Sequence, residues 1–238
     1  HCVVSKDPDS DWTNWGMYRN MIHTKNILGG IIEPHCHMGM MYHRKYEPRN
    51  IPMPFAIAIG TEPVTAFGSL TKVPFGVPEA DMVGALRREP IELVKCETVD
   101  IEVPATSEIV IEGEVPPHER AFEGPFGEYS GYRASPRDKR PIFKVKAITH
   151  RNNPILSVSC MGVPMDDSHP TTALSVGAEI LSELRAKGVP VVDVCNYAQC
   201  ATYVTVVSIK AAYSNLAERV ADIVWGSEAA ENRPYVIV

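Results

Sequence analysis

Short apolar or alternating segments, bounded by turn residues, dominate residues 1–160. Five of them are expected to form strands, at 54–59, 91–103, 107–115, 141–149 and 155–160. Asn152-Asn153-Pro154 is a turn signal between the last two. A short helix is predicted from Pro78, a good first-turn residue, to about Arg88. Several strands interrupted by one or two helices favour a barrel-like sheet.

A helical period replaces this pattern from residue 168 onward. Ser168 is expected to cap a helix and Gly188 to end it. The apolar positions on one face of this helix are Ala173, Val176, Ile180, Leu181 and Leu184. Strands are predicted at 190–195 and 202–209, followed by a helix after Ser214 and a strand at 234–238. This β-β-α-β order indicates the start of a second α/β unit.

Composition narrows the class of protein. The 238 residues are 45% hydrophobic and carry a net charge of −6, from 23 basic and 29 acidic side chains. A mildly acidic chain argues against binding of nucleic acid or anionic membrane through a basic field. No apolar run approaches the roughly 20 residues of a membrane span. We therefore expect neither nucleic acid nor membrane as a partner.

The cysteines and the chain ends add two expectations. Six cysteines lie scattered without a C-x-x-C pair, which predicts a reducing, cytoplasmic setting rather than a disulfide scaffold. The chain opens at His1 without an initiator Met and closes on the strand-like Tyr235-Val236-Ile237-Val238. We interpret this as an internal piece of a longer polypeptide.

The segment from Glu123 to Tyr132 is the first candidate for chemistry. Its two carboxylates, Glu123 and Glu128, lie five residues apart in a Gly/Pro-containing loop with Phe126 and Tyr129 between or beside them. Apolar surroundings raise a carboxyl pKa toward neutrality, as general-acid catalysis requires. The alternative interpretation is a turn with two solvated acids.

The segment Asp11–Arg19 is the second candidate. Two tryptophans, the amide of Asn14 and the guanidinium of Arg19 occur close together. Arginine suits bidentate recognition of a carboxylate or phosphate. The alternative is an ordinary packed strand with a surface arginine.

Histidines form the third candidate. In Glu33-Pro34-His35-Cys36-His37 the ligand types suit zinc, but no second Cys/His pair follows at finger spacing. One His is instead available to join carboxylate and amide oxygens around Mg²⁺ or Mn²⁺, or to be simply satisfied or exposed. His169 is expected to cap or precede its helix, and a catalytic role stays open. Motifs for nucleotide hydrolysis, dinucleotide binding and serine hydrolysis are absent from the sequence.

Taken together, these segments resemble the UbiD-type decarboxylases that use prenylated FMN, including the ferulic acid decarboxylases. The resemblance covers nearly the whole chain, and the motifs keep their order and spacing. It rests on Thr13-Asn14-Trp15 with Arg19, Lys95-Cys96-Glu97-Thr98, Val103-Pro104-Ala105-Thr106-Ser107-Glu108, Glu112-Gly113, Glu123-Gly124-Pro125-Phe126-Gly127-Glu128, Gly131-Tyr132 and Val145-Lys146-Ala147.

The resemblance implies an α+β, mainly β fold. A split β-barrel flavin-binding domain, similar to that of flavin reductases, would occupy 1–165. A connector helix would span 166–189, and 190–238 would begin a truncated C-terminal α/β oligomerisation domain. The full-length protein is then expected to be a homo-oligomer, with further domains outside this chain.

The resemblance also implies a site. Arg19, Glu123 and Glu128 match the catalytic trio, in which Glu128 delivers the proton that replaces CO₂. Asn14, His37 and Glu79 match the ligands of a Mn²⁺ or Mg²⁺ ion that bridges the cofactor phosphate. The backbone around Trp15 and Gly68-Ser69-Thr71 matches a K⁺ site. The implied cofactor-binding residues are Asn14, Trp15, Met17, Arg19, Cys36, His37, Ser69 and Glu79.

The implied activity is reversible, non-oxidative decarboxylation of an aromatic, heteroaromatic or α,β-unsaturated acid, with a flavin prenyltransferase supplying the cofactor. The chain departs from the ferulic acid enzymes at Gly16-Met17-Tyr18, His35-Cys36 and Tyr129, where they carry Ser-Ile-Ala, Pro-Gln and Met. A more polar, Tyr-lined pocket favours a hydroxylated or heteroaromatic acid. The alternatives are a cofactor- or metal-binding module without turnover and an FMN-dependent reductase.

Overall fold

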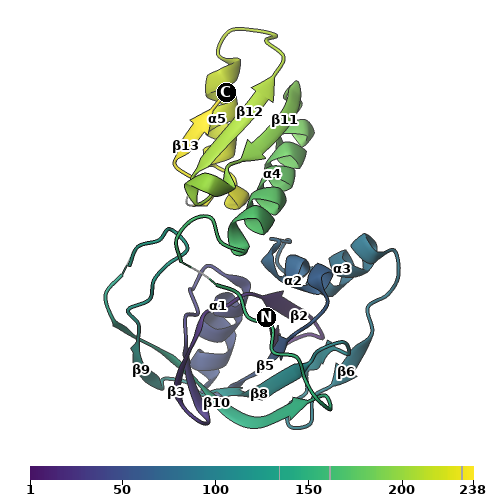
Figure 1. The fold of residues 1–238 in the computed structure, drawn as a ribbon, viewed down its shortest axis with the longest axis vertical. Helices are drawn as coiled ribbons and strands as arrows, with labels where there is room; N and C mark the ends of the chain where they lie inside the picture. Colours follow the sequence, from purple (N-terminus) through teal and green to yellow (C-terminus); the bar gives the residue numbers. More distant parts are fainter. Residues whose placement is uncertain (134, 161, 232) are drawn as a thin grey trace. The chain divides into compact units, whose positions relative to one another are not determined.

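The computed structural model describes residues 1–133, 135–160, 162–231 and 233–238, in two compact units (Figure 1). Unit 1 comprises His1–Pro125 and Ser135–Val158, and unit 2 comprises Phe126–Ala134 and Ser159–Val238. The chain therefore leaves unit 1 for one short segment, returns, and crosses again. A mixed α+β fold, as predicted, is confirmed, while the split barrel and the domain limits at 165 and 189 stay predictions.

Antiparallel pairing builds the main sheet of unit 1, in the order β2-β1-β5-β8-β10-β4-β3 with β9 on β10. A separate pair, β6 with β7, forms a second small sheet. The strand bounds are β1 Cys2–Lys6, β2 Thr13–Gly16, β3 Asn20–Thr24, β4 Ile27–Gly30, β5 Met53–Ile59, β6 Leu93–Lys95, β7 Glu102–Pro104, β8 Ile109–Val115, β9 Arg120–Glu123 and β10 Asp138–His150.

The apolar run of β5 is explained by cover on both faces of the sheet. Phe55 and Ile57 join one buried cluster, whereas Ala56 and Ala58 join another, because successive side chains point to opposite faces. Helix α1 (His37–Met41), the π-helical turn Tyr42–Tyr46 and the 3₁₀ turn Glu47–Arg49 follow one another beside the first cluster. Helices α2 (Pro63–Leu70) and α3 (Glu79–Arg87) pack together beside the second.

Two strand predictions within residues 1–160 are wrong. The predicted strand 91–103 is a pair of short strands, β6 and β7, joined by a loop. Glu112, fully buried on β8, holds that loop by accepting hydrogen bonds from the Glu97 and Thr98 amides at 3.1 and 2.6 Å. The segment 155–160 forms no strand, and Ile155 and Val158 are 70% and 84% exposed. An apolar run becomes a strand only where a partner strand pairs with it.

The other predictions for unit 1 are largely confirmed. Strands β5, β8 and β10 correspond to the segments at 54–59, 107–115 and 141–149, and β10 begins earlier than expected. Helix α3 occupies the predicted helical segment, but it starts at Glu79 and Pro78 is its N-cap residue.

Unit 2 has the predicted β-β-α-β order after its first helix. Strands β11 and β12 pair antiparallel, and β12 and β13 pair parallel. Helix α4 packs against β11 and α5 against β13 (Figure 1). The bounds are α4 Ser168–Ala186, β11 Val191–Asn196, a 3₁₀ turn Ala198–Cys200, β12 Val204–Ile209, α5 Leu216–Trp225, a 3₁₀ turn Glu228–Ala230 and β13 Tyr235–Ile237.

The first turn of α4 differs from the prediction. Asp167 occupies the N-cap position, and Ser168 is the first helical residue. The side chain of Asp166 accepts the Ser168 amide hydrogen bond at 2.8 Å, so a carboxylate before the helix satisfies a donor there. Of the predicted apolar face, Val176, Ile180 and Leu184 are buried. Among all the residues described, no helix is both long and apolar enough to span a bilayer.

Candidate active site

Arg19 and Glu123 form a partly buried, bidentate ion pair. Arg19 lies in the connection between β2 and β3, and Glu123 ends β9. The guanidinium Nε is 2.9 Å from Oε1 and Nη2 is 2.8 Å from Oε2. The Glu123 side chain is 2% exposed and that of Arg19 is 24% exposed. The interpretations of Glu123 as a solvated acid and of Arg19 as a surface residue are therefore wrong.

A second buried carboxylate, Glu79, joins the start of α3 to β2. The Asn14 Nδ2 donates to Glu79 Oε1 at 3.0 Å, and the Trp15 amide donates to Oε2 at 2.8 Å. Glu79 is 2% exposed, and Asn14 and Trp15 are equally buried. A negative charge in the first turn of a helix is favourable because the N-terminal amides point toward it. The fold thus accommodates this carboxylate with main-chain and amide donors.

His37 completes the predicted ligand set. It is the first residue of α1, and its Nδ1 lies 3.7 Å from Glu79 Oε1. The rings of Trp12 and Phe75 contact the imidazole, with centroid distances of 5.6 and 5.5 Å. The structure therefore brings Asn14, His37 and Glu79 together from three different elements.

These three residues fit a hard divalent cation. Amide oxygen, imidazole nitrogen and carboxylate are ligands that Mn²⁺ and Mg²⁺ accept. Across the described ranges, no group of three or more His, Cys, Asp or Glu side chains is arranged to hold a metal. Since only two residues of this set belong to those types, the protein would supply part of the coordination and a phosphate or water the rest. The metal assignment stays a prediction.

Tyr18, one of the predicted departures from the ferulic acid pattern, also belongs to this cluster. Its hydroxyl donates to Asn14 Oδ1 at 2.9 Å and accepts from the Met38 amide at 3.3 Å. Burial raises the pKa of Tyr18 well above 10, with the neighbouring Cys36 adding to the rise. Tyr18 and Cys36 both depart from the ferulic acid pattern, and their side chains contact each other. The feature of the sequence that indicates a place for Tyr18 in this cluster is its position between the two predicted site residues Asn14 and Arg19.

The remaining predicted cofactor residues lie in the same unit. Burial raises the pKa of the Cys36 thiol, which donates to the Glu33 carbonyl at 2.9 Å. The buried Ser69 hydroxyl donates to the Thr65 carbonyl within α2, at 2.9 Å. Met17 is half-buried between β2 and β3. The roles of these side chains, and the K⁺ site around Trp15 and 68–71, stay predictions.

Glu128, the third predicted catalytic residue, belongs to unit 2. It is half-buried in a turn, where its amide donates to the Tyr132 carbonyl and its carbonyl accepts from the Gly131 amide, each at 2.9 Å. Gly131 has φ +86, a conformation that favours glycine. The predicted trio thus comes from two units, and its meeting in one site stays a prediction.

The sequence predicted that His169 caps or precedes α4, and this prediction is wrong. It is the second residue of the helix, and it is 1% exposed. Its Nε2 donates to the carbonyl of Tyr129, beside Glu128, at 2.8 Å. The structure therefore places it in contact with the loop of a predicted catalytic residue.

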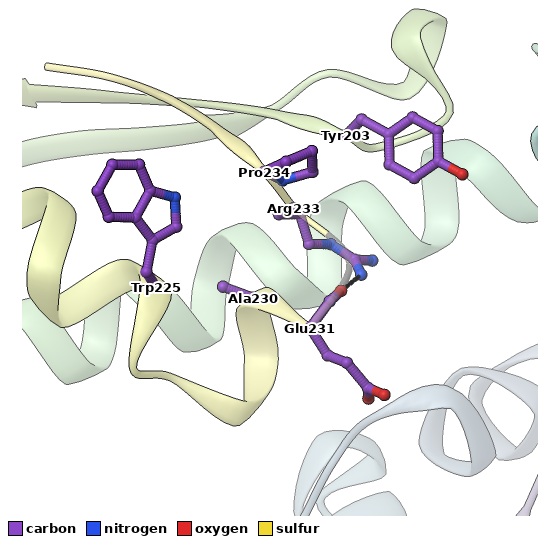
Figure 2. A pocket seen from close by; sticks show the side chains of 6 residues that line it. All are labelled: Tyr203, Trp225, Ala230, Glu231, Arg233 and Pro234. Carbon is purple, nitrogen blue, oxygen red and sulfur yellow. Dashed lines mark hydrogen bonds between the residues drawn. The ribbon is translucent and has the colours of Figure 1, made fainter.

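A pocket of roughly 440 Å³ lies within unit 2 and contains none of the predicted site residues. Figure 2 shows the Arg233 side chain hydrogen-bonded to the main chain of Glu231, with the Trp225 ring on the α5 side. The other lining residues are Tyr203, Ala230 and Pro234. We assign the candidate chemistry to the carboxylate clusters instead, because they combine buried charge with the predicted residues.

Comparison with known proteins identifies the family. The UbiD family, described as the 3-octaprenyl-4-hydroxybenzoate carboxy-lyase Rift-related domain, matches residues 1–164. Pyrrole-2-carboxylic acid decarboxylase of Pseudomonas aeruginosa is 36% identical, over 99% of this chain and 49% of that protein. Ferulic acid decarboxylase 1 of Saccharomyces cerevisiae is 36% identical, over 80% of this chain and 38% of that protein.

Solved structures agree with this result. An evolved dimeric form of the UbiD-class enzyme HmfF from Pelotomaculum thermopropionicum, in complex with prFMN, superposes with a TM-score of 0.89 at 33% identity, over 99% of this chain and 54% of that one. Vanillic acid decarboxylase of Sedimentibacter hydroxybenzoicus gives 0.88 at 31% identity, over 99% and 50%. The chain belongs to the UbiD family of decarboxylases. It spans about half the length of these structures and at most about half that of the curated relatives it matches.

Proposed function

We propose that this chain is the cofactor-binding part of a reversible, non-oxidative decarboxylase that acts on an aromatic, heteroaromatic or α,β-unsaturated carboxylic acid with prenylated FMN. The observation that carries the proposal is the partly buried Arg19–Glu123 pair. Its arginine directly follows Tyr18 in the chain, and the Tyr18 hydroxyl bonds to Asn14. An ion pair whose carboxylate is 2% exposed, and whose arginine is the chain neighbour of a residue bonded to a candidate metal ligand, is expected of an active centre rather than of a structural core.

The chemistry of the proposed reaction explains why a cofactor is needed. Loss of CO₂ from an sp² carbon leaves an in-plane anion that the π system of the substrate does not stabilise. Side chains offer no electron sink for it, and prenylated FMN would supply one when bound. In this proposal Asn14, His37 and Glu79 would hold the divalent metal and, through it, the cofactor phosphate.

The remaining roles fall to charged side chains. Arg19, held by both oxygens of Glu123, would fix the geometry and charge of the pocket. Glu128 would give its proton to the carbon that loses CO₂, as a general acid. Both carboxylates would thereby serve one reaction, Glu123 as a fixed anion and Glu128 as a proton donor.

The substrate class follows from the relatives and from Tyr18. Pyrrole-2-carboxylic, ferulic and vanillic acids, after which relatives are named, each carry the carboxyl group on an sp² carbon. In this chain the Tyr18 hydroxyl and the Cys36 thiol add polar groups near Asn14. We therefore favour a hydroxylated or heteroaromatic acid over a cinnamic acid.

The test uses the natural polypeptide that carries this chain, co-expressed with a flavin prenyltransferase. We expect the mass of the released cofactor to be that of prenylated FMN, and CO₂ to be formed from at least one of pyrrole-2-carboxylate, vanillate or ferulate. Expression without the prenyltransferase is the control. Release of unmodified FMN, or of no flavin, would contradict the proposal.

Glu128→Gln tests the assignment of the proton donor separately. The variant keeps size and polarity but has no acidic proton, so turnover should fall by about 10²–10⁴ while cofactor binding is retained. Glu128→Asp, which keeps the acid with a shorter reach, should retain part of the activity. Near-normal turnover of the Gln variant would show that a group other than Glu128 donates the proton.

A further inference from the structure

We infer that His169 is a positioning residue that fixes the main chain at Glu128. The inference rests on the proposed function, in which Glu128 donates the proton. His169 touches neither reacting atoms nor cofactor in this inference, and it acts through the carbonyl of Tyr129. Both groups lie in unit 2, so the contact belongs to one compact part of the chain.

The contact is a buried hydrogen bond to the residue that follows Glu128. His169 Nε2 is 2.8 Å from the Tyr129 carbonyl oxygen, and the His169 side chain is 1% exposed. A carbonyl only accepts, so Nε2 carries the hydrogen. That hydrogen is present both in the neutral tautomer and in the imidazolium ion. The hold on Tyr129 therefore does not depend on the charge of His169.

Asp166 fixes the other edge of the imidazole. The Asp166 amide lies 3.0 Å from Nδ1, and its carboxylate Oδ1 lies 2.8 Å from the same atom. The carboxylate is itself held, because it accepts from the Ser168 amide, the Ser168 hydroxyl and the Gly162 amide at 2.8, 2.6 and 3.1 Å. The ring orientation is thus set by the chain at the start of α4 rather than by the loop.

Two main-chain hydrogen bonds close the loop on itself. The Glu128 amide bonds to the Tyr132 carbonyl and the Gly131 amide to the Glu128 carbonyl, so both of these bonds lie within the turn. The Tyr129 ring lies 6.1 Å from the His169 ring and 5.8 Å from the Tyr203 ring, measured between centroids. His169 and Tyr203 thereby tie the turn to α4 and to the segment before β12. A displacement of the main chain here would move the Glu128 carboxyl, and small misplacements of a catalytic group cost rate steeply.

Three substitutions separate this hydrogen bond from simple filling of space. Gln has an amide nitrogen that reaches the position of Nε2, so His169→Gln should keep the donor to Tyr129. Asn is shorter and places its amide near Nδ1, so His169→Asn should lose that donor. His169→Leu removes the hydrogen bonds to both the Tyr129 carbonyl and the Asp166 amide. Ser175→Ala is the matched control, because Ser175 is a buried residue of the same helix whose hydroxyl donates to the Thr172 carbonyl within α4.

The first readout is hydrogen–deuterium exchange of residues 126–133 in the natural polypeptide, with β11 and β12 as internal reference. We expect exchange to rise about two- to tenfold in the Asn and Leu variants, the factor that one lost hydrogen bond represents. The Gln variant and Ser175→Ala should stay close to wild type. Unchanged exchange in the Asn variant, or the same rise in the Gln variant, would overturn the inference.

The second readout is the turnover of the cofactor-loaded enzyme. We expect kcat to fall at least tenfold in His169→Asn and to recover in His169→Gln, with KM unchanged, since positioning of the acid affects the chemical step. Equal kcat in the Asn and wild-type enzymes would overturn the inference. Absence of decarboxylation by the wild type would contradict the proposed function instead, and the exchange data would still decide whether His169 holds the loop.

Discussion

Glu123 and Glu79, two of the buried carboxylates of unit 1, accept from different donors, and this difference separates their proposed roles. Glu123 is neutralised by the guanidinium of Arg19 in two hydrogen bonds. Glu79 is held by a main-chain amide and the amide of Asn14, with His37 at 3.7 Å. The printed donors on Glu79 are neutral amides, so a bound cation would be the group that balances a carboxylate at this position. We therefore place the metal at Glu79 and not at Glu123.

Removal of a metal ligand tests this placement. Glu79→Ala or His37→Ala should lower the retention of metal and of prenylated FMN together, since these residues would hold the cofactor phosphate through the metal. We would measure bound Mn²⁺ by elemental analysis and flavin by absorbance after gel filtration. Asp81→Ala is the control, because Asp81 is an exposed acid in the first turn of the same helix. Full retention of both by the Glu79 variant would contradict the metal assignment.

The Arg19–Glu123 pair makes a prediction for stability. Arg19→Leu leaves a buried carboxylate without its cation, and such changes cost about 3 kcal/mol or more of unfolding free energy. The double variant with Glu123→Leu should recover most of this loss. Urea-induced unfolding gives both values. Arg49→Leu, which removes the exposed pair with Asp9, is the control and should change the unfolding free energy much less, because water screens an exposed pair. Equal costs for Arg19→Leu and Arg49→Leu would refute the argument.

At the scale of elements, Glu47 connects the 3₁₀ turn that it begins to β9, the strand that carries Glu123. It contacts Arg120, the first residue of β9, at 2.6 Å, and accepts from the His118 amide at 3.0 Å. Burial opposes ionisation of Glu47, but the hydrogen bonds from Arg120, His118 and His43 prevail and lower its pKa to about 2. The ion pair thereby fixes the start of β9.

This lowered pKa predicts how stability depends on pH. In the unfolded chain the Glu47 carboxyl titrates near ~4.3. Because the folded-state pKa is lower, its contribution to the unfolding free energy is fully present above about pH 5 and is lost as the pH falls toward 2. Glu47→Gln should be less stable than wild type at pH 7, with the difference shrinking by pH 3. Urea unfolding at pH 7, 5 and 3 measures it.

Glu119→Gln is the control for this pH series. Glu119 is a neighbouring acid whose ion pair with Lys144 is about half exposed, so its removal should change stability little at any pH. A difference between Glu47→Gln and wild type that stays constant from pH 7 to pH 3 would contradict the prediction.

At the scale of the molecule, each unit has a buried core of its own. Leu184 is fully buried in the cluster of unit 2, whereas Phe55 belongs to a cluster of unit 1. Leu184→Ala should cost about 2–5 kcal/mol and raise hydrogen exchange in β12 first, leaving β5 protected. Leu174→Ala, on the same helix but 67% exposed, should change little. Simultaneous loss of protection in β5 and β12 would show that the two cores unfold as one.

The sequence by itself determined the elements whose signal is local. The 3.6-residue period of α4 and the apolar run of β5 follow from which side chains recur along the chain, and the structure has both. The ordered motifs around Asn14, Arg19 and Glu123 were sufficient to identify the family. Such patterns can be recognised without knowledge of the fold, because they depend on residues that are close together in the chain.

The tertiary structure alone decided which groups meet and which are buried. Arg19 and Glu123 are 104 positions apart, and Asn14 and Glu79 are 65 apart. The segment 155–160 has the composition of a strand but stays exposed. His169 looked like a helix cap but is buried against the Tyr129 carbonyl. Burial and hydrogen bonding depend on which segments pack against a residue, and a local pattern does not specify that partner.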